Sequence, residues 1–167
     1  MSSVLYLVRH GIAEDASSTG SDADRCLTDD GVRKMRRAAR GLRRLGIVPD
    51  AVLTSPLRRA EQTATILAEV LSRDLTVERY PPLEPGHAAK EVLDGLSQYA
   101  RARHIVLVGH QPDLGRLASH LLTGAANRAP LAFKKGAVAA IEVASLPPQG
   151  AGELQWFLTP SQLRAIG

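Results

Sequence analysis

The chain has 167 residues, 44% of them hydrophobic, and a formal net charge of +4 at pH 7. This length and apolar content are enough for one sizeable core, so we expect a single domain over residues 1–167. The lone cysteine, Cys26, excludes an internal disulfide and suits a reducing compartment. The first apolar run is too short for a signal peptide or a membrane helix, so we expect a cytoplasmic protein without membrane contact.

Short β-branched apolar runs alternate with amphipathic helical patterns along most of the chain. The predicted strands lie near residues 4–8, 51–54, 75–79 and 105–108, and the predicted helices near 29–45, 57–72, 88–101 and 112–122. That alternation predicts an α/β fold, a three-layer α/β/α sandwich with a mostly parallel sheet. Strand-like segments at 137–143 and 153–158 flank a turn region and predict a C-terminal antiparallel hairpin at one edge of the sheet.

Two of the predicted strands end on a histidine. The first strand runs into Arg9, His10 and Gly11, and the fourth ends on His110. Either histidine alone would more often be structural or merely exposed. However, the carboxyl ends of parallel strands form the ligand crevice of an open α/β sheet, so both imidazoles would share one site if the two strands are neighbours.

The residues beside these histidines suit an anion better than a metal. Arg9 carries a planar fork that matches phosphate oxygens, and Gly11 has no Cβ to hinder a close approach of the backbone to an oxyanion. A metal site would need carboxylates or thiolates nearby, whereas the neighbours of the second histidine are Gly109 and Gln111. We therefore predict a phosphate-sized pocket that needs no metal or other cofactor.

The end of the predicted strand 51–54 adds two arginines. Ser55 is expected to be the N-cap of the following helix and Pro56 its first residue, so Arg58 and Arg59 lie in the first turn. Free backbone amides and the helix dipole favour an anion there. Neighbouring residues lie about 100° apart around a helix, so only one arginine points well into a site. Two solvated surface arginines are the alternative interpretation.

Four motifs follow one another at these strand ends and helix starts. They are Arg9-His10-Gly11, Leu27-Thr28 with Gly31, the run 55–63, and Gly109-His110-Gln111-Pro112. In this order they resemble the histidine phosphatase superfamily, which has the phosphoglycerate mutase-like fold, and within it the SixA-type phosphohistidine phosphatases. The resemblance implies that His10 is a nucleophile that becomes phosphorylated. It also implies that Arg9, Arg59 and His110 hold the phosphoryl oxygens, with Arg59 rather than Arg58 matching the family pattern.

The general acid is the point at which the sequence departs from larger relatives. Those proteins have a carboxylate after the third strand that protonates a departing alkoxide. Here Glu84 is available in that region, but its surroundings do not match the usual motif. Glu14 and Asp15, just past the first motif, are rivals, and a solvated loop glutamate is the remaining interpretation.

Taken together, the residues and the resemblance predict a metal-independent phosphatase that acts through a phosphohistidine enzyme intermediate. The leading substrate is phosphohistidine on a protein, such as a histidine-phosphorylated signalling domain. A phosphatase of small phosphorylated metabolites (sugar or nucleotide monophosphates) and a non-catalytic phosphate-binding module are the alternatives. The arginine-rich segment 33–44 lacks interleaved aromatic residues, so we expect a solvated helix face and no nucleic-acid partner. The polar segment 15–25 is expected to be a mobile loop.

Overall fold

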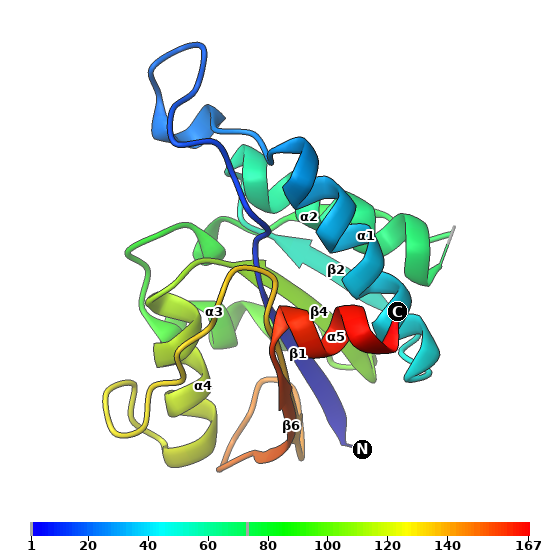
Figure 1. Ribbon diagram of the computed structural model, residues 1–167. Helices are drawn as coiled ribbons and strands as arrows, with labels where there is room; N and C mark the ends of the chain where they lie inside the picture. The colour runs from blue at the N-terminus through cyan, green and yellow to red at the C-terminus, as the bar shows by residue number, and fades with distance from the viewer. Residues whose placement is uncertain (1, 73) are drawn as a thin grey trace.

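The structure, a computed structural model, describes residues 2–72 and 74–167. Its centre is one six-stranded sheet with the strand order β3-β2-β4-β1-β5-β6. The pairs among β1 to β4 are parallel, whereas β5 is antiparallel to β1 and β6 is antiparallel to β5 (Figure 1). The strands are β1 (Ser3–Arg9), β2 (Ala51–Thr54), β3 (Val77–Arg79), β4 (His104–Gly109), β5 (Val138–Val143) and β6 (Glu153–Leu158). The predicted mostly parallel sheet with an antiparallel edge hairpin is confirmed.

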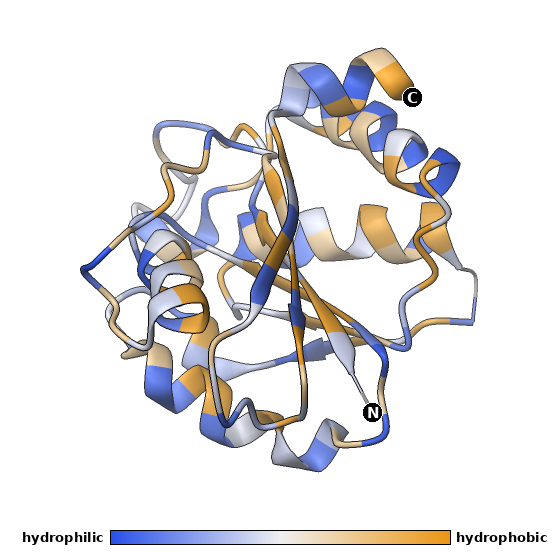
Figure 2. Ribbon diagram, turned by 90° about the horizontal axis from the view of Figure 1, so that it is seen from below, coloured by the Kyte–Doolittle hydropathy of each residue, from blue (hydrophilic) through white to orange (hydrophobic). Residues whose placement is uncertain are grey.

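Helices cover both faces of the sheet. The α-helices are α1 (Asp29–Arg44), α2 (Arg58–Leu71), α3 (Ala89–Asp94), α4 (Asp113–Thr123) and α5 (Pro160–Ile166). Figure 1 shows α1, α2 and α5 on one side of the sheet and α3 and α4 on the other. Figure 2 shows that the central strands carry long hydrophobic stretches, while the helices alternate between hydrophobic and hydrophilic segments. The structure therefore has the predicted three-layer α/β/α architecture.

Alternation along the strands divides the core into two clusters, because successive side chains of a strand point to opposite faces. Leu5 and Leu7 of β1 pack in the cluster that contains the buried leucines of α3 and α4. Tyr6 and Val8 pack in the cluster that contains Met35 of α1 together with buried residues of α2 and α5. Both faces of β1 are thus buried, which is why this strand reads as a continuous apolar run.

Several predicted boundaries need correction. The helix expected to begin with Ser55 as N-cap begins at Arg58, and its N-cap position is Leu57. The helix expected over 88–101 is the short α3, followed by a 3₁₀ segment that starts at Gly95. Glycine is a weak helix former, which fits the end of α3 at Gly95. A Cβ on Gly95 would lie 2.0 Å from the Tyr80 hydroxyl, so close packing explains why a glycine stands there. The strand expected over 75–79 is only three residues long.

The C-terminal helix α5 was not among the predicted elements, although the sequence contains its start signal. The Thr159 side chain accepts a hydrogen bond from the Gln162 amide, the Gln162 side chain reaches back to the cap, and Pro160 is the first helical residue. The helix packs so closely on α1 that a Cβ on Gly41 would lie 2.2 Å from the Leu163 carbonyl oxygen. This contact completes the core on that face of the sheet.

Two surface segments can be compared with their predictions: the basic face of α1 and the polar segment 15–25. The arginines of α1 are exposed, and the residues that this helix buries are small or apolar, as expected for a solvated basic face. Residues 15–25 form the segment that projects from the body near α2 in Figure 1, and contain a 3₁₀ turn at Asp22–Asp24. Mobility of this segment stays a prediction. No helix in the described residues is long and apolar enough to cross a membrane.

Candidate active site

The register of the sheet brings the two histidines together. Strands β1 and β4 are parallel neighbours with Arg9 opposite Gly109, so His10 and His110 follow at the same level. The His10 amide donates a hydrogen bond to the Gly109 carbonyl (3.1 Å), and the two imidazole centroids are 5.1 Å apart. The expected meeting of both imidazoles at the carboxyl edge of the sheet is confirmed.

Backbone contacts and burial set the state of the His10 ring. Nδ1 lies 2.7 Å from the Gly11 carbonyl oxygen, which can only accept, so Nδ1 carries the proton and Nε2 keeps its lone pair. The side chain is 5% exposed, and burial above all lowers the pKa of His10 to about 4. The bond to Gly11 opposes this shift, while the nearby charges of Arg59 and Arg9 add to it. His10 is therefore a neutral imidazole with a free nitrogen at pH 7.

His110 is held by Ser55, which follows the end of β2. Its Nε2 lies 2.8 Å from the Ser55 hydroxyl oxygen, and that oxygen also accepts from the Leu57 amide (3.3 Å). The described residues offer the buried Ser55 hydroxyl proton no acceptor other than Nε2, so Nε2 accepts it and the ring proton of a neutral His110 lies on Nδ1. Burial, followed by the charges of His10 and Arg59, lowers the pKa of His110 to about 3. Nδ1 is a buried donor that has no partner in the described part of the chain.

Each of the two arginines predicted for the site has hydrogen bonds from its terminal nitrogens and a buried Nε without a partner in the described residues. Arg59 is 5% exposed and binds Asp22 twice, through Nη1 to the backbone oxygen (2.8 Å) and through Nη2 to the carboxylate (3.1 Å). Arg9 donates from Nη1 to the Phe133 carbonyl (2.7 Å). The Nε atoms of Arg9 and Arg59 are buried and have no partner among the described residues. Arg58 is exposed and lines a different surface hollow between α1 and α2.

Gly11 was expected to let the backbone approach an oxyanion closely, and the structure shows further contacts of this residue. Its amide donates to the Thr63 hydroxyl (3.0 Å), so this N–H is already engaged. A Cβ at Gly11 would lie 2.7 Å from Cγ of Met35, which places the glycine against α1. The close packing on Met35 is thus a reason for a glycine at this position, and its expected part in binding an oxyanion stays a prediction. Thr63 in turn donates to the Arg59 carbonyl (2.7 Å) and ties this motif to α2.

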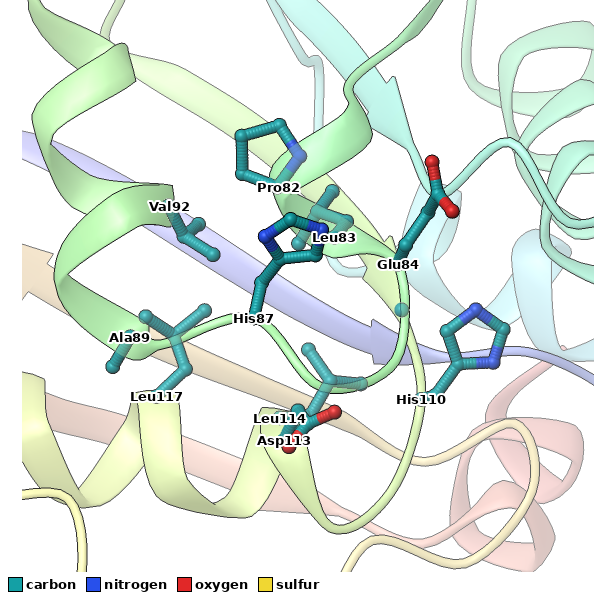
Figure 3. Close-up of a pocket in the computed structure, with 11 residues that line it drawn as sticks. Pro82, Leu83, Glu84, His87, Ala89, Val92, His110, Asp113, Leu114 and Leu117 are labelled. Carbon is teal, nitrogen blue, oxygen red and sulfur yellow. The ribbon is translucent and has the colours of Figure 1, made fainter.

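The three candidate acids lie in different surroundings. Glu84 is half-buried and lines a pocket that His110 also lines (Figure 3). Glu14 and Asp15 are exposed residues of the segment after the first motif. Among the residues that the structure describes, no group of three or more histidine, cysteine, aspartate or glutamate side chains is placed to hold a metal ion.

Sequence reasoning missed three residues that support the site. Ser55 was assigned to helix capping although it holds His110, and Thr63 and Asp22 were given no role. Ser55 and Thr63 belong to the run 55–63 that carried the family resemblance, so a signal for them was present. Asp22 lies in the polar segment 15–25, where the sequence gives no periodicity from which a contact with Arg59 follows.

Comparisons with known proteins agree on one family. The model of the histidine phosphatase superfamily (branch 1) matches residues 5–84. An uncharacterized protein from Picosynechococcus is 39% identical over 122 residues, which are 72% of this chain and 73% of that protein. The phosphohistidine phosphatase SixA of Escherichia coli is 29% identical over 163 residues, covering 96% of each chain.

Solved structures extend this likeness to the fold. The protein histidine phosphatase SixA in complex with tungstate superposes with a TM-score of 0.83 at 27% identity, covering 96% of this chain and 99% of that one. The α-ribazole phosphatase of Shigella flexneri shares the fold at 20% identity, with a TM-score of 0.74 and coverage of 94% and 96%. The fold is therefore common to phosphatases whose names give different substrates.

Proposed function

Since the chain belongs to the histidine phosphatase superfamily and is a phosphatase, we propose that it removes phosphate from phosphohistidine on a protein, through an intermediate on His10. The observation that carries the proposal is the donor set around a neutral imidazole. Among the described residues, Arg9 Nε, Arg59 Nε and His110 Nδ1 are buried nitrogens without a hydrogen-bond partner, and these three side chains lie near the His10 ring. Leaving such donors unsatisfied is costly, and a phosphoryl group would satisfy them.

In the first step, the lone pair of His10 Nε2 attacks phosphorus in line with the bond to the leaving group. A P–N bond to His10 forms as the bond to the leaving group breaks. Phosphoryl transfer depends mainly on positioning and on neutralising the three equatorial oxygens. The guanidinium groups of Arg9 and Arg59 and the N–H of His110 supply both, and they lie in a buried site where such contacts are stronger than in water.

In the second step, water attacks the phosphorus of the phosphoenzyme. The P–N bond to His10 breaks, its electron pair returns to Nε2, and inorganic phosphate is released. Splitting one difficult displacement into two is the general advantage of covalent catalysis. The Gly11 carbonyl keeps the proton of the His10 ring on Nδ1 in both steps, so Nε2 is the nitrogen that gains and loses the phosphoryl group.

The nature of the leaving group favours phosphohistidine over a phosphate ester. Imidazole leaves readily because its conjugate acid titrates near neutrality, at about 6.5. An alkoxide has a far more basic oxygen and needs a proton delivered in the transition state, which is worth about 10²- to 10⁴-fold. The likeness to SixA proteins over nearly the whole chain supports the same substrate class.

A second candidate, hydrolysis of small phosphate monoesters, rests on Glu84. Glu84 lines the same pocket as His110, and a carboxyl group is the kind of side chain that protonates a departing alkoxide. A substrate panel at equal concentration separates the two functions: a phosphohistidine-containing signalling domain, phosphoramidate, a sugar phosphate and a nucleotide monophosphate. We expect the two N–P substrates to be hydrolysed at least about tenfold faster than the esters, since the esters depend on acid catalysis. Preference for an ester would refute the phosphohistidine assignment.

A further inference from the structure

The two histidines of the site are chemically alike, but their rings are bound in opposite ways. In His10, Nδ1 lies 2.7 Å from the Gly11 carbonyl oxygen, a group that can only accept a hydrogen bond. In His110, Nε2 lies 2.8 Å from the Ser55 hydroxyl oxygen, a group that can donate one. An acceptor keeps the proton of a neutral ring on the nitrogen that it contacts, whereas a donor keeps it on the other nitrogen. Both rings therefore carry their lone pair on Nε2, and in His110 this lone pair is taken up by Ser55.

The surroundings of Ser55 leave its hydroxyl proton one acceptor among the described residues. Ser55 is fully buried, and its amide donates to the Val108 carbonyl of β4 (3.0 Å), so its backbone is fixed between two strands. The Leu57 amide donates to the hydroxyl oxygen (3.3 Å), and the Thr54 hydroxyl donates to the Ser55 carbonyl (3.1 Å). A buried hydroxyl that lacks an acceptor is costly. The hydroxyl proton is therefore directed to Nε2 of His110.

The charges near His110 would favour the opposite tautomer if this hydroxyl were absent. The charged and titratable groups that act on the ring or line the pocket beside it are His10, Arg59, Asp22, Arg9, Glu84, His87 and Asp113. Burial above all lowers the pKa of His110, with His10 and Arg59 adding to the shift, so the ring is neutral at pH 7. A guanidinium group only donates, so beside Arg59 and Arg9 a lone pair on Nδ1 is favoured over an N–H. The bond from Ser55 opposes this preference.

We propose that Ser55 is a positioning residue that makes His110 a hydrogen-bond donor and leaves His10 as the nucleophile. The inference rests on the proposed function and deepens it. With the ring proton held on Nδ1, His110 donates to an oxygen of the phosphoryl group and offers no lone pair to phosphorus. Without the Ser55 hydroxyl, the ring proton moves from Nδ1 to Nε2. The lone pair left on Nδ1 then repels the phosphoryl oxygens, and the hydrogen bond to them is lost.

The direct test reads the ring protons in protein labelled with ¹⁵N-histidine at pH 7. Two-bond ¹H–¹⁵N spectra distinguish a ring nitrogen that carries a proton from one that carries a lone pair, and the His110→Gln variant identifies the His110 signals. We expect the proton of His110 mainly on Nδ1 in the wild type and mainly on Nε2 in Ser55→Ala. A proton mainly on the same nitrogen in both proteins would overturn the inference. This measurement needs no substrate, so it decides the inference even if the protein fails to hydrolyse phosphohistidine and the proposed function is wrong.

Turnover of phosphoramidate tests the consequence for the reaction. We expect Ser55→Ala to lower kcat/KM by about tenfold or more, because the transition state loses a preorganised donor. Ser55→Thr keeps a hydroxyl and should recover part of this loss. Thr54→Val is the matched control, since it removes the neighbouring buried hydroxyl, which donates to the Ser55 carbonyl, and it should leave kcat/KM near the wild-type value. Equal losses in Ser55→Ala and Thr54→Val, with both variants folded by thermal melting, would overturn the inference.

Discussion

Replacing Arg59 by alanine tests the donor set of Arg9, Arg59 and His110 that is proposed to hold the phosphoryl group. The Arg59 side chain is 5% exposed and its Nε has no partner in the part of the chain that the structure describes, so the variant loses both a donor and a positive charge beside His10. By analogy with the loss of an oxyanion donor, we expect kcat/KM to fall by about 30- to 1,000-fold, or about 2 to 4 kcal/mol of transition-state stabilisation. Asp22 loses one partner but keeps its ion pair with Arg25 and is solvent-exposed, so its carboxylate stays solvated.

The assay is the steady-state hydrolysis of phosphoramidate, with thermal melting to confirm that each variant is folded. Arg58→Ala is the matched control, because Arg58 is the preceding residue of the same helix turn and is exposed outside the site. We expect it to change kcat/KM by less than about threefold, in keeping with a surface substitution. Arg59→Lys should recover only part of the loss, since lysine keeps the charge but not the planar fork. Equal losses of kcat/KM in Arg58→Ala and Arg59→Ala would show that Arg59 has been wrongly assigned to the phosphoryl-binding donors.

Four further predictions follow from the same geometry. Burial lowers the pKa of His10 to about 4 and that of His110 to about 3, whereas an unperturbed histidine titrates near 6.5. Between those lowered values and pH 6.5, the unfolded chain therefore binds more protons than the folded protein does. The free energy of unfolding should therefore fall as the pH drops from 6.5 toward 4, by up to about 3 kcal/mol per histidine, and urea titrations of His110→Gln should show a shallower fall. A chelator should leave the hydrolysis rate unchanged, and vanadate should inhibit more tightly than phosphate because it mimics the five-coordinate transition state; rescue of a chelated sample by zinc would contradict this. Glu84→Gln should change phosphoramidate hydrolysis by less than about tenfold, whereas a hundredfold loss would identify Glu84 as a general acid. Asp22→Ala should weaken vanadate binding through Arg59 more than Asp24→Ala does, and equal inhibition constants would exclude a positioning role for Asp22.

The parts of the fold that follow from local patterns were accessible from the sequence. Continuous apolar runs identified β1 and β4, because both faces of these strands are buried. The apolar stripe at helical spacing along α1 predicted both ends of this helix to within one residue. The joint position of His10 and His110 depended on β1 and β4 being neighbours, which the strand order confirms.

The features that the sequence did not predict depend on contacts between distant segments. The bond from Arg59 to Asp22 spans 37 positions, and the bond from His110 to Ser55 spans 55. The Ser-Pro pair after β2 is typical of a helix start. Here the Ser55 hydroxyl accepts a local bond from the Leu57 amide and makes a long-range bond with His110, and the helix begins later. The start of α5 was signalled by a capping box, and its short length kept it from standing out as a periodic pattern.

The phosphoenzyme on His10 is the most direct test of the proposed mechanism. The wild type and His10→Ala are mixed with phosphoramidate, quenched rapidly without acid, and measured by intact mass, with peptide mapping to locate the label. We predict one added phosphoryl group on the wild type, located on His10, and none on His10→Ala, which should also lose turnover. Full turnover by His10→Ala, or a phosphoryl group on another residue of the wild type, would contradict the account.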